Sequence, residues 1–242
     1  MSVPDIFYTP PENTSSDKLY IKNSELHHLK KVHRKKTGDI IVVVNGRGSA
    51  WSCEISDISD HCATAVIIDS LPDYGEADIE LTLAVGIPKR TKFEWILEKG
   101  TELGVCHFIP LLTERTLMKP GYAKMERWQK ILIAAMKQCQ RSRIPQITKP
   151  ISFERFVADE SRNSVKFIAH EKTRIRDQLW QKTIANTNAV TMCIGPEGGF
   201  GDNEMTYALE NGFLSVSLGV RRLRTETAAI AAISIIMAML NN

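Results

Sequence analysis

The sequence contains few cysteines, and their positions suggest neither a metal site nor a disulfide framework. The five cysteines are Cys53, Cys62, Cys106, Cys139 and Cys193. They form no CxxC pair and no Cys/His cluster with zinc spacing, and an odd count argues against a complete set of disulfides. We therefore expect reduced thiols, most of them small buried side chains, in a cytoplasmic protein without a bound metal.

The sequence also lacks a hydrophobic run that could cross a bilayer. The longest apolar run, residues 228–240, is interrupted by Ser234 and is typical of a buried helix. The first residues, MSVPDIFYTP, lack the basic and apolar regions of a signal peptide. A chain of 242 residues with 43% hydrophobic and 24% charged residues predicts a globular protein of one or two domains. Its net charge of +3 is too small to indicate a polyanionic partner by itself.

Several catalytic motifs are missing as well. There is no GxSxG nucleophile elbow, no Walker A loop with its Lys-Ser/Thr, and no GxGxxG dinucleotide fingerprint. The histidines of HHLKKVH (27–33) have no cysteine or carboxylate partners at metal spacing. These absences argue against that type of serine hydrolase, a P-loop nucleotidase and a histidine-based zinc site.

Hydrophobic periodicity divides the chain into two regions. Up to about residue 72, strand-like runs alternate with glycine-rich turns, which predicts a small β-barrel or sandwich. These runs are IIVVV (40–44), AWSCEI (50–55) and ATAVII (63–68). The Pro-, Gly- and acid-containing segment 71–78 fits a linker. From residue 79, buried strands alternate with helices, including residues 122–141 and 174–184, which predicts an α/β domain with a mostly parallel sheet.

Two predicted strand-to-helix turns in the second region have unusual compositions. IGPEGGFGDNE (194–204) is rich in glycine, and LGVRRLRTETA (218–228) contains three arginines and a candidate N-cap, Thr225. Open α/β sheets bind ligands at the carboxyl ends of their strands, so the two turns together can build one pocket. Backbone groups of the glycine loop can grip an adenine edge. The alternatives are an ordinary glycine-rich turn and solvated surface charge.

Two basic stretches are candidates for nucleic-acid contacts. HHLKKVHRKKTGD (27–39) contributes Lys30, Lys31, Arg34, Lys35 and Lys36. KQCQRSRIPQI (137–147) ends a predicted helix with Arg141 and Arg143, which suit phosphate or base contacts. The alternatives are a solvated helix for the first stretch and a stabilised helix C-terminus for the second.

In this order, the stretches resemble the RsmE family of small-subunit ribosomal RNA methyltransferases, a part of the SPOUT superfamily. The family patterns are HLxxVLR…GD, KxTELGV, EQxxRxxxP, GPEGGF…E and LGxRILRTETA. They correspond here to HLKKVHRKKTGD, KGTELGV, KQCQRSRIP, GPEGGFGDNE and LGVRRLRTETA. The resemblance covers nearly the whole chain, and the last two motifs are specific. Four positions depart from the usual residues: Asp5 (frequently Arg), His33 (Leu), Lys137 (Glu) and Arg222 (apolar).

The resemblance implies a PUA-like RNA-binding β-barrel over residues 1–72 and a SPOUT methyltransferase domain with a deep trefoil knot over residues 73–242. It also implies a homodimer with the active site at its interface, S-adenosylmethionine as cofactor, and 3-methyluridine in 16S ribosomal RNA as product. The assembled small ribosomal subunit is the expected substrate. By resemblance, the cofactor-binding residues are His170, Ile194, Gly195, Glu197, Gly198, Leu218, Gly219 and Leu223. The basic residues of 30–36 and Arg143 are the expected RNA contacts.

The chemistry of uridine N3 suggests roles for further residues. N3 carries a proton and takes part in base pairing, so the base must be unpaired and N3 must lose its proton for an in-line methyl transfer. Cations near O2 and O4 would stabilise the anionic base, and we predict Arg141, from the same or the partner chain, or Arg224 in this role. Glu226 and Glu197 are candidate general bases, with solvent as the alternative.

Three other functions fit parts of the sequence. They are a SPOUT enzyme acting on transfer RNA, an RNA-binding protein that lost catalysis, and a nucleotide-binding metabolic enzyme. The barrel with the TELGV and RTETA motifs argues against the first, and the intact glycine and arginine loops argue against the second. The basic segment 30–36 argues against the third.

Overall fold

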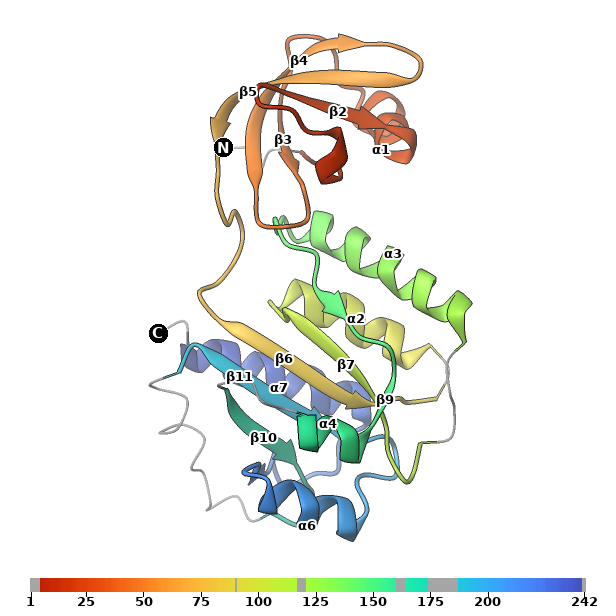
Figure 1. Cartoon of the computed structure of the whole chain (residues 1–242), viewed down its shortest axis with the longest axis vertical. Coiled ribbons are helices and arrows are strands. Elements are labelled where there is room, and N and C mark those ends of the chain that lie inside the picture. The colour runs from red at the N-terminus through yellow and green to blue at the C-terminus, as the bar shows by residue number, and fades with distance from the viewer. Residues whose placement is uncertain (1–4, 90, 117–120, 160–163, 174–186, 241–242) are drawn as a thin grey trace. The chain divides into compact units, whose positions relative to one another are not determined.

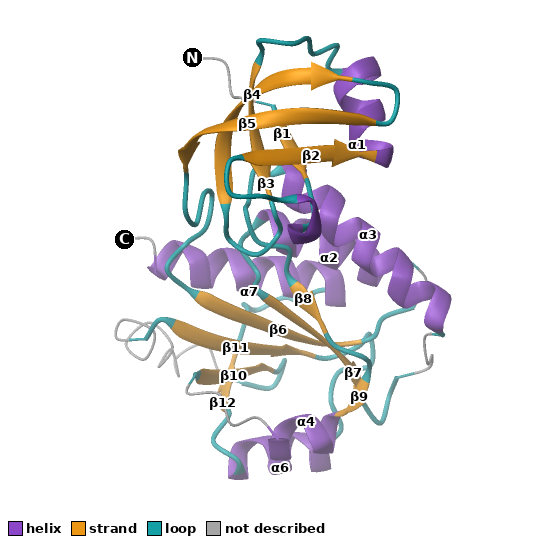
Figure 2. Cartoon of the chain, turned by 45° about the horizontal axis from the view of Figure 1, so that its top comes forward, coloured by secondary structure: helices purple, strands orange, loops and turns teal. Residues whose placement is uncertain are grey.

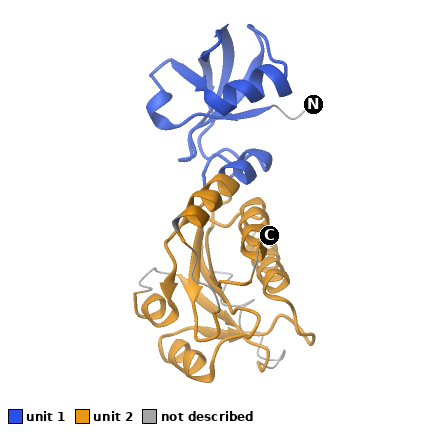
Figure 3. Ribbon diagram, turned by 90° about the vertical axis from the view of Figure 1, so that its right-hand side faces the viewer, with its two compact units in different colours: residues 1–76, 133–144 blue, residues 77–132, 145–242 orange. Residues whose placement is uncertain are grey.

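The computed structural model describes residues 5–89, 91–116, 121–159, 164–173 and 187–240. The chain forms two units (Figure 3), which are Met1–Glu76 with Ile133–Ile144, and Ala77–Leu132 with Pro145–Asn242. The C-terminal part of helix α3 (Tyr122–Gln138) thus belongs to the first unit, although it lies within the second region of the sequence. No helix in the described ranges is long and apolar enough to span a bilayer.

The first unit is built on a five-stranded sheet with the order β1-β3-β4-β5-β2 (Figure 2). Its strands are β1 (Ile6–Tyr8), β2 (Lys18–Lys22), β3 (Ile40–Val44), β4 (Ala50–Ile58) and β5 (Cys62–Ser70). The strand β1 runs parallel to β3, and the other pairs are antiparallel. Alternate residues of β2 and β3, such as Leu19, Ile21, Ile41 and Val43, are buried in one core. Burial thus follows a period of two in β2, whereas in β3 Val42 and Val44 are buried as well, in a second cluster on the other face of the sheet.

The β-barrel predicted for the first unit is found only in part, because the sheet is an open, curled half-barrel. Among the described residues the two edge strands, β1 and β2, do not pair with each other. The strand β1 has only three residues, and its one partner in the sheet is β3. Three short helical segments follow the edges: η1 (Pro11–Asn13), α1 (Asn23–His27) and the π-helical turn η2 (His28–Val32). Leu26 and Leu29 of the last two pack into the core of the sheet.

The second unit is an α/β domain whose sheet has the order β12-β10-β11-β6-β7-β8, with β9 beside β7; Figure 1 labels its central strands and Figure 2 all of them. Its strands are β6 (Glu80–Gly86), β7 (His107–Leu112), β8 (Gln146–Ile147), β9 (Ile151–Ser152), β10 (Val165–Ala169), β11 (Ala189–Ile194) and β12 (Leu214–Val216). Every strand pair is parallel, as predicted. The central strands are buried along almost their whole length, which is typical of a sheet covered on both faces.

Helices cover the two faces of this sheet (Figure 2). On one side α4 (Phe153–Asp159) and α6 (Asp202–Glu210) pack their apolar residues against the strands. On the other side α7 (Thr225–Leu240) packs on β11 and against α2 (Lys92–Glu102). The helix predicted over residues 174–184 lies outside the described residues. The parallel order places the ends of β7, β10, β11 and β12 at one edge, where the site is found.

Candidate functional site

A pocket of about 520 Å³ opens at the carboxyl ends of the strands of the second unit. It is lined by residues that follow four strands. They are Arg115 after β7, Ala169–Lys172 at the end of β10, Ile194–Phe200 with Asp202 after β11, and Ser217–Leu223, Thr225 and Ala228 after β12. This is the edge at which open parallel sheets bind ligands, and the volume is in the range of small-molecule sites.

The two loops that the sequence singled out form most of the pocket wall together. All eight residues predicted to bind a cofactor line it: His170, Ile194, Gly195, Glu197, Gly198, Leu218, Gly219 and Leu223. They come from the ends of β10, β11 and β12, which are adjacent in the sheet in the order β12-β10-β11. The structure therefore brings this set together, while its role in binding a cofactor remains a prediction.

The glycine loop after β11 is folded tightly upon itself. Gly199 has φ of 71° and donates its N–H to the carbonyl of Pro196 at 2.8 Å, which closes a turn. A Cβ atom on Gly195 would lie 3.0 Å from the Cα of Gly199. A Cβ atom on Gly86, at the end of β6, would lie 2.4 Å from the Cδ of Pro196. Side chains at these positions would push the loop out of place, which explains why small residues occur there.

Charged side chains fix the glycine loop from two directions. Arg115 donates to the carbonyl oxygen of Gly198 at 2.6 Å. The carboxylate of Glu204, only 5% exposed, accepts the N–H groups of Gly201 at 2.8 Å and Glu114 at 2.9 Å. Glu204 thus caps α6 and ties it to the segment after β7. The Gly-x-x-Glu spacing could have indicated this cap, whereas no local signal pointed to Arg115.

A lysine links the two pocket loops. Lys92, in the first turn of α2, has its Nζ 3.7 Å from Oε1 of Glu197 and 3.3 Å from Oε1 of Glu226. Glu197 also accepts the N–H of Lys89 at 3.0 Å. The other oxygen of Glu226, Oε2, is buried and has no hydrogen-bond partner among the described residues. The sequence indicated both carboxylates but not Lys92. A lysine at the start of an amphipathic helix looks like ordinary surface charge.

The arginine-rich loop after β12 lines the pocket with residues 217–223. Gly219, with φ of 123°, adopts a backbone conformation that favours glycine. Arg222 lies 3.5 Å from the Glu171 carboxylate and donates to the carbonyl of Glu197 at 3.4 Å, so this departure from the family pattern gains partners in the pocket wall. Arg224 is exposed, and its carbonyl accepts the first helical hydrogen bond of α7, from Ala228.

His170 is a pocket residue whose titration is affected by its surroundings. Burial, and to a smaller degree the ammonium of Lys172, lower the pKa of the His170 imidazole. The backbone N–H of His170 donates to the carbonyl of Val216 at 3.0 Å, which fixes the end of β10 beside β12. A neutral imidazole at pH 7 can donate one hydrogen bond to a ligand and accept another.

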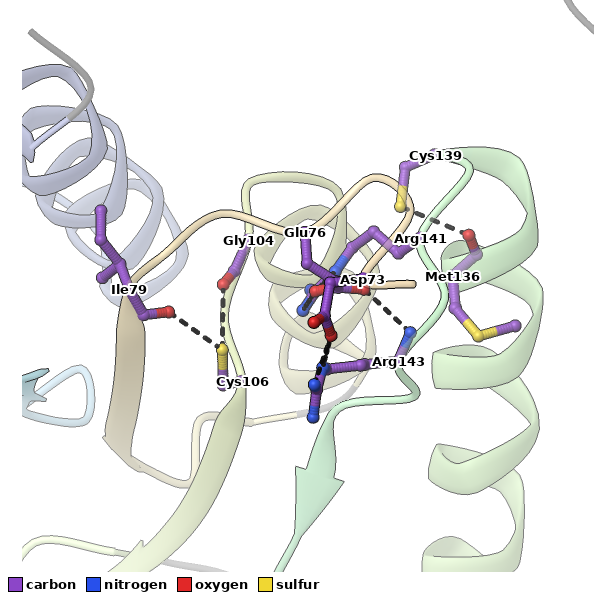
Figure 4. Close-up of polar contacts among 9 residues, drawn as sticks. All are labelled: Asp73, Glu76, Ile79, Gly104, Cys106, Met136, Cys139, Arg141 and Arg143. Carbon is purple, nitrogen blue, oxygen red and sulfur yellow. Dashed lines mark hydrogen bonds and ion pairs between the residues drawn. The ribbon is translucent and has the colours of Figure 1, made fainter. Parts of the chain in front are cut away.

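Arg141, predicted to be catalytic, does not line this pocket and belongs to the first unit. Its side chain is 4% exposed and donates from Nε and Nη2, at 3.0 and 2.8 Å, to one oxygen of Glu76 (Figure 4). The other Glu76 oxygen accepts the N–H of Arg143 at 2.8 Å, and the Arg143 guanidinium pairs with Asp73. The segments around Glu76 and Arg141 are therefore bound to each other, which favours a structural role for Arg141.

The basic segment of the first unit is partly neutralised by acids. Lys30 pairs with Asp60 at 3.1 Å, and Lys35 pairs with Asp5 at 2.8 Å. Three further cations, Lys31, Arg34 and Lys36, have exposed side chains and form no ion pair with the described residues. These three are the members of the predicted set that are best suited to contact a phosphate backbone.

Two departures from the family pattern contact each other in the first unit. Nδ1 of His33 lies 3.0 Å from one oxygen of Asp5, and Lys35 lies beside the other. The hydrogen bond from Lys35 is the main cause that lowers the pKa of the Asp5 carboxyl. A third departure, Lys137, forms an ion pair with Glu25, and both side chains are mostly buried. These unusual residues thus have partners within the same unit.

The thiols of the chain form no disulfide. All five cysteines are free, and burial raises the pKa of the Cys53 thiol to about 12, so this thiol is protonated at neutral pH. In the described ranges, no three His, Cys, Asp or Glu side chains gather closely enough to hold a metal ion. The pocket therefore depends on backbone groups and charged side chains.

The second unit is thus an α/β domain with a glycine-lined pocket, and the first unit is a half-barrel that carries exposed cations. The family model for the RNA methyltransferase domain matches residues 75–237, and that for the RNA methyltransferase PUA domain matches residues 21–68. The chain therefore belongs to the RNA methyltransferase family that these models describe.

Curated relatives and solved structures agree with this assignment. The chain is 34% identical to Ribosomal RNA small subunit methyltransferase E of Synechocystis sp., in a match that covers 96% of this chain and 77% of the relative. It is 30% identical to the protein of the same name from Bacillus subtilis, in a match that covers 89% of this chain and 88% of the relative. A crystal structure of the protein of this name from Neisseria gonorrhoeae, bound to S-adenosyl methionine, superposes with a TM-score of 0.86 at 29% identity, covering 98% of both chains. The structure of a putative methyltransferase from Legionella pneumophila, in complex with the same cofactor, superposes with a TM-score of 0.85 at 32% identity. That match again covers 98% of both chains.

Proposed function

We propose that this chain transfers a methyl group from S-adenosylmethionine to N3 of a uridine in 16S ribosomal RNA, in the cytoplasm. The pocket carries the proposal, because eight residues predicted from the resemblance line one cavity of about 520 Å³. Relatives that match most of this chain are named as small-subunit ribosomal RNA methyltransferases, and two similar structures are described as binding this cofactor. The assembled small subunit is the proposed substrate, since a second, RNA-binding unit allows contacts beyond the reacting base.

The residues of the pocket suit this cofactor. Gly195 and Gly198 line the cavity without side chains of their own, and a Cβ atom on Gly198 would lie 3.1 Å from the side chain of Arg115. Acidic and basic side chains, including Glu171 and Lys172, also line the cavity and match an ammonium and a carboxylate at one end of a ligand. When bound, the cofactor supplies an electrophilic methyl group on a sulfonium.

The cation that stabilises the uracil is assigned to Arg224 rather than to Arg141. Arg224 is exposed and lies between Leu223 and Thr225, both of which line the pocket. Its guanidinium can donate to O2 or O4 of a base that enters the site, where negative charge develops as N3 loses its proton. To do the same, Arg141 would have to leave the buried carboxylate of Glu76.

The two candidate bases are assigned to positioning, and the N3 proton is assigned to solvent. Glu197 is engaged by Lys89 and Lys92, and Glu226 faces Lys92 with one oxygen while the other is buried. A general base must reach the proton that it removes, and each of these two carboxylates already faces the ammonium of Lys92. A uracil N3–H made more acidic by Arg224 can give its proton to water.

The proposed enzyme is a homodimer with the active site at its interface. The helix α7 is apolar from Ala228 to Leu240 except Ser234, yet several of these residues keep part of their surface exposed. Trp95, on the neighbouring helix α2, is 42% exposed. A second copy would cover this apolar surface. Light scattering on the wild type and on Trp95→Lys would test the idea, and a monomeric wild type would refute it.

The deep trefoil knot is part of the same proposal. Its support is the strand order, in which the chain passes from β11 across to β12 and then returns, as α7, onto β11. The loops after β11 and β12 would then be held against each other, which suits a pocket that both of them line.

The test uses small ribosomal subunits without the modification, naked 16S RNA and bulk transfer RNA. Each is incubated with the protein and deuterium-methyl S-adenosylmethionine, then digested to nucleosides for mass spectrometry. Labelled 3-methyluridine from the subunits is the expected result. Label in transfer RNA alone would overturn the proposed specificity, and cofactor binding without label in any RNA would overturn the acceptor.

A further inference from the structure

A buried hydroxyl group in the pocket wall has no partner. Thr225, the first residue of α7, is 4% exposed and lines the pocket. Its Oγ1 forms no hydrogen bond with any described residue. Only three other buried side-chain atoms in the described part of the chain share this property, on Thr14, Ser142 and Glu226, and none of these residues lines the pocket. A buried hydroxyl without a partner costs roughly 1–3 kcal/mol, so such a group calls for an explanation.

Helix capping does not explain Thr225, although the sequence made it a candidate N-cap. The carbonyl of Arg224 accepts the N–H of Ala228 at 2.8 Å, so Arg224 holds the N-cap position and Thr225 follows it. Nor does the hydroxyl bond back to the preceding turn, as buried threonines in helices commonly do. Thr101 of α2 shows that solution, because its Oγ1 donates to the carbonyl of Leu97 at 2.7 Å. The hydrogen-bonding capacity of this hydroxyl is thus unused among the described residues, at a residue that lines the pocket.

The surroundings of Thr225 indicate which part of a ligand it meets. Helix α7 packs on β11, and Thr225 and Ala228 of α7 line the same pocket as Ile194, which ends β11. Ala169 ends the neighbouring strand β10 and is also a lining residue. An apolar wall with one hydroxyl suits the flat ring of an adenine, whose edge carries both hydrogen-bond donors and acceptors. The charged loops after β10 and β12 suit the polar end of the ligand instead.

We infer that the hydroxyl of Thr225 hydrogen-bonds to the adenine edge of an adenosine-containing ligand in this pocket. The inference rests on the proposed function and deepens it, since it adds a side-chain contact to a site otherwise formed mainly by backbone groups. Thr225 is a binding residue in this assignment, and its hydroxyl takes no part in proton transfer.

Isothermal titration calorimetry tests this contact with S-adenosylhomocysteine and with adenosine. Thr225→Val keeps the shape of the side chain and removes the hydroxyl, so both ligands should bind about 3- to 10-fold more weakly. Thr225→Ser keeps the hydroxyl and should stay within about 2-fold of the wild type. Thr227→Val, on the exposed side of the same helical turn, is the matched control and should change neither affinity.

The outcomes separate this inference from the proposed function. If the wild type binds both ligands and Thr225→Val binds them with the same affinities, the inference is overturned while the proposed function stands. Weaker binding of S-adenosylhomocysteine but not of adenosine would place the contact on the amino-acid end, and would also overturn it. A wild type that binds neither ligand would overturn the proposed cofactor and the inference together. Thermal unfolding of each variant confirms that the folded protein is being titrated.

Discussion

Removing either partner of the Arg141–Glu76 pair should destabilise the first unit strongly. The two side chains are 4% and 8% exposed, so each charge depends on the other rather than on water. Arg141→Met leaves the Glu76 carboxylate with the N–H of Arg143 as its remaining donor among the bonds described above. An unpaired charge at a buried site costs roughly 3–5 kcal/mol. Against a typical total stability of roughly 5–15 kcal/mol, that loss is large.

A double-mutant cycle isolates the interaction between the two residues. Glu76→Gln keeps an oxygen that can accept the Arg143 N–H, so the double variant Arg141→Met/Glu76→Gln removes both charges with little other change. We expect the double variant to be more stable than the sum of the single losses implies, with a coupling of about 2 kcal/mol or more. Urea unfolding, followed by circular dichroism and by tryptophan fluorescence, gives the free energies, and disagreement between the probes would identify separate transitions of the two units.

The exposed pair Arg155–Asp159 on α4 is the control. Its side chains are 75% and 65% exposed, so Arg155→Met should be hard to distinguish from the wild type. A loss below about 1 kcal/mol for Arg141→Met, or additive losses in the double variant, would refute the structural role. A stable Arg141→Met variant that binds cofactor but transfers no methyl group would instead support the catalytic role predicted from the sequence.

Three further perturbations test the pocket. Lys92→Met should weaken S-adenosylhomocysteine binding several-fold in calorimetry by releasing Glu197, whereas Lys99→Met, which affects only pairs within α2, should not. Gly86→Ala should lower both affinity and melting temperature, since its Cβ would lie 2.4 Å from Pro196, and an unchanged variant would contradict the packing. Because burial lowers the folded-state pKa of His170, the unfolded chain binds the proton more readily. The wild type should therefore lose stability relative to His170→Gln as pH falls below about 6.5, with no such difference above it, and parallel urea-unfolding profiles would rule this out.

The parallel sheet of the second unit was readable from the sequence because its strands are buried on both faces. Continuous apolar runs such as residues 189–194 stand out against the helices between them. Short elements were missed, since two-residue strands such as β8 are defined by pairing rather than by pattern. The helix α4 did carry a signal, in the spacing of Phe153, Phe156 and Val157. Its seven residues are too few to nucleate a helix without the core against which they pack.

Periodicity could not reveal that the first sheet is open. Alternation along β2 records which side chains are buried, and a closed barrel and a curled open sheet produce the same alternation. The difference lies in whether the edge strands pair. That depends on the twist and length of β1, which has three residues and no distinctive pattern.

The position of the pocket was predictable, but its charge network was not. Glycines and arginines marked the two loops because such residues are unusual where a strand meets a helix. The partners of the charged groups come from distant parts of the chain: Glu76 lies 65 residues from Arg141, and Lys92 reaches the first turn of the C-terminal helix. A single sequence contains no record of such pairs, so Arg141 was interpreted from the motif around it.

The departures from the family pattern show why substitutions should be considered in pairs. Asp5 alone suggests the loss of a cation that could contact RNA, and His33 alone suggests the loss of an apolar contact. In the structure the two side chains meet at 3.0 Å, and Asp5 also neutralises Lys35. This part of the first unit therefore carries less positive charge than its composition implies. Contacts with a phosphate backbone should then fall on the exposed cations Lys31, Arg34 and Lys36, and not on the paired Lys30 or Lys35.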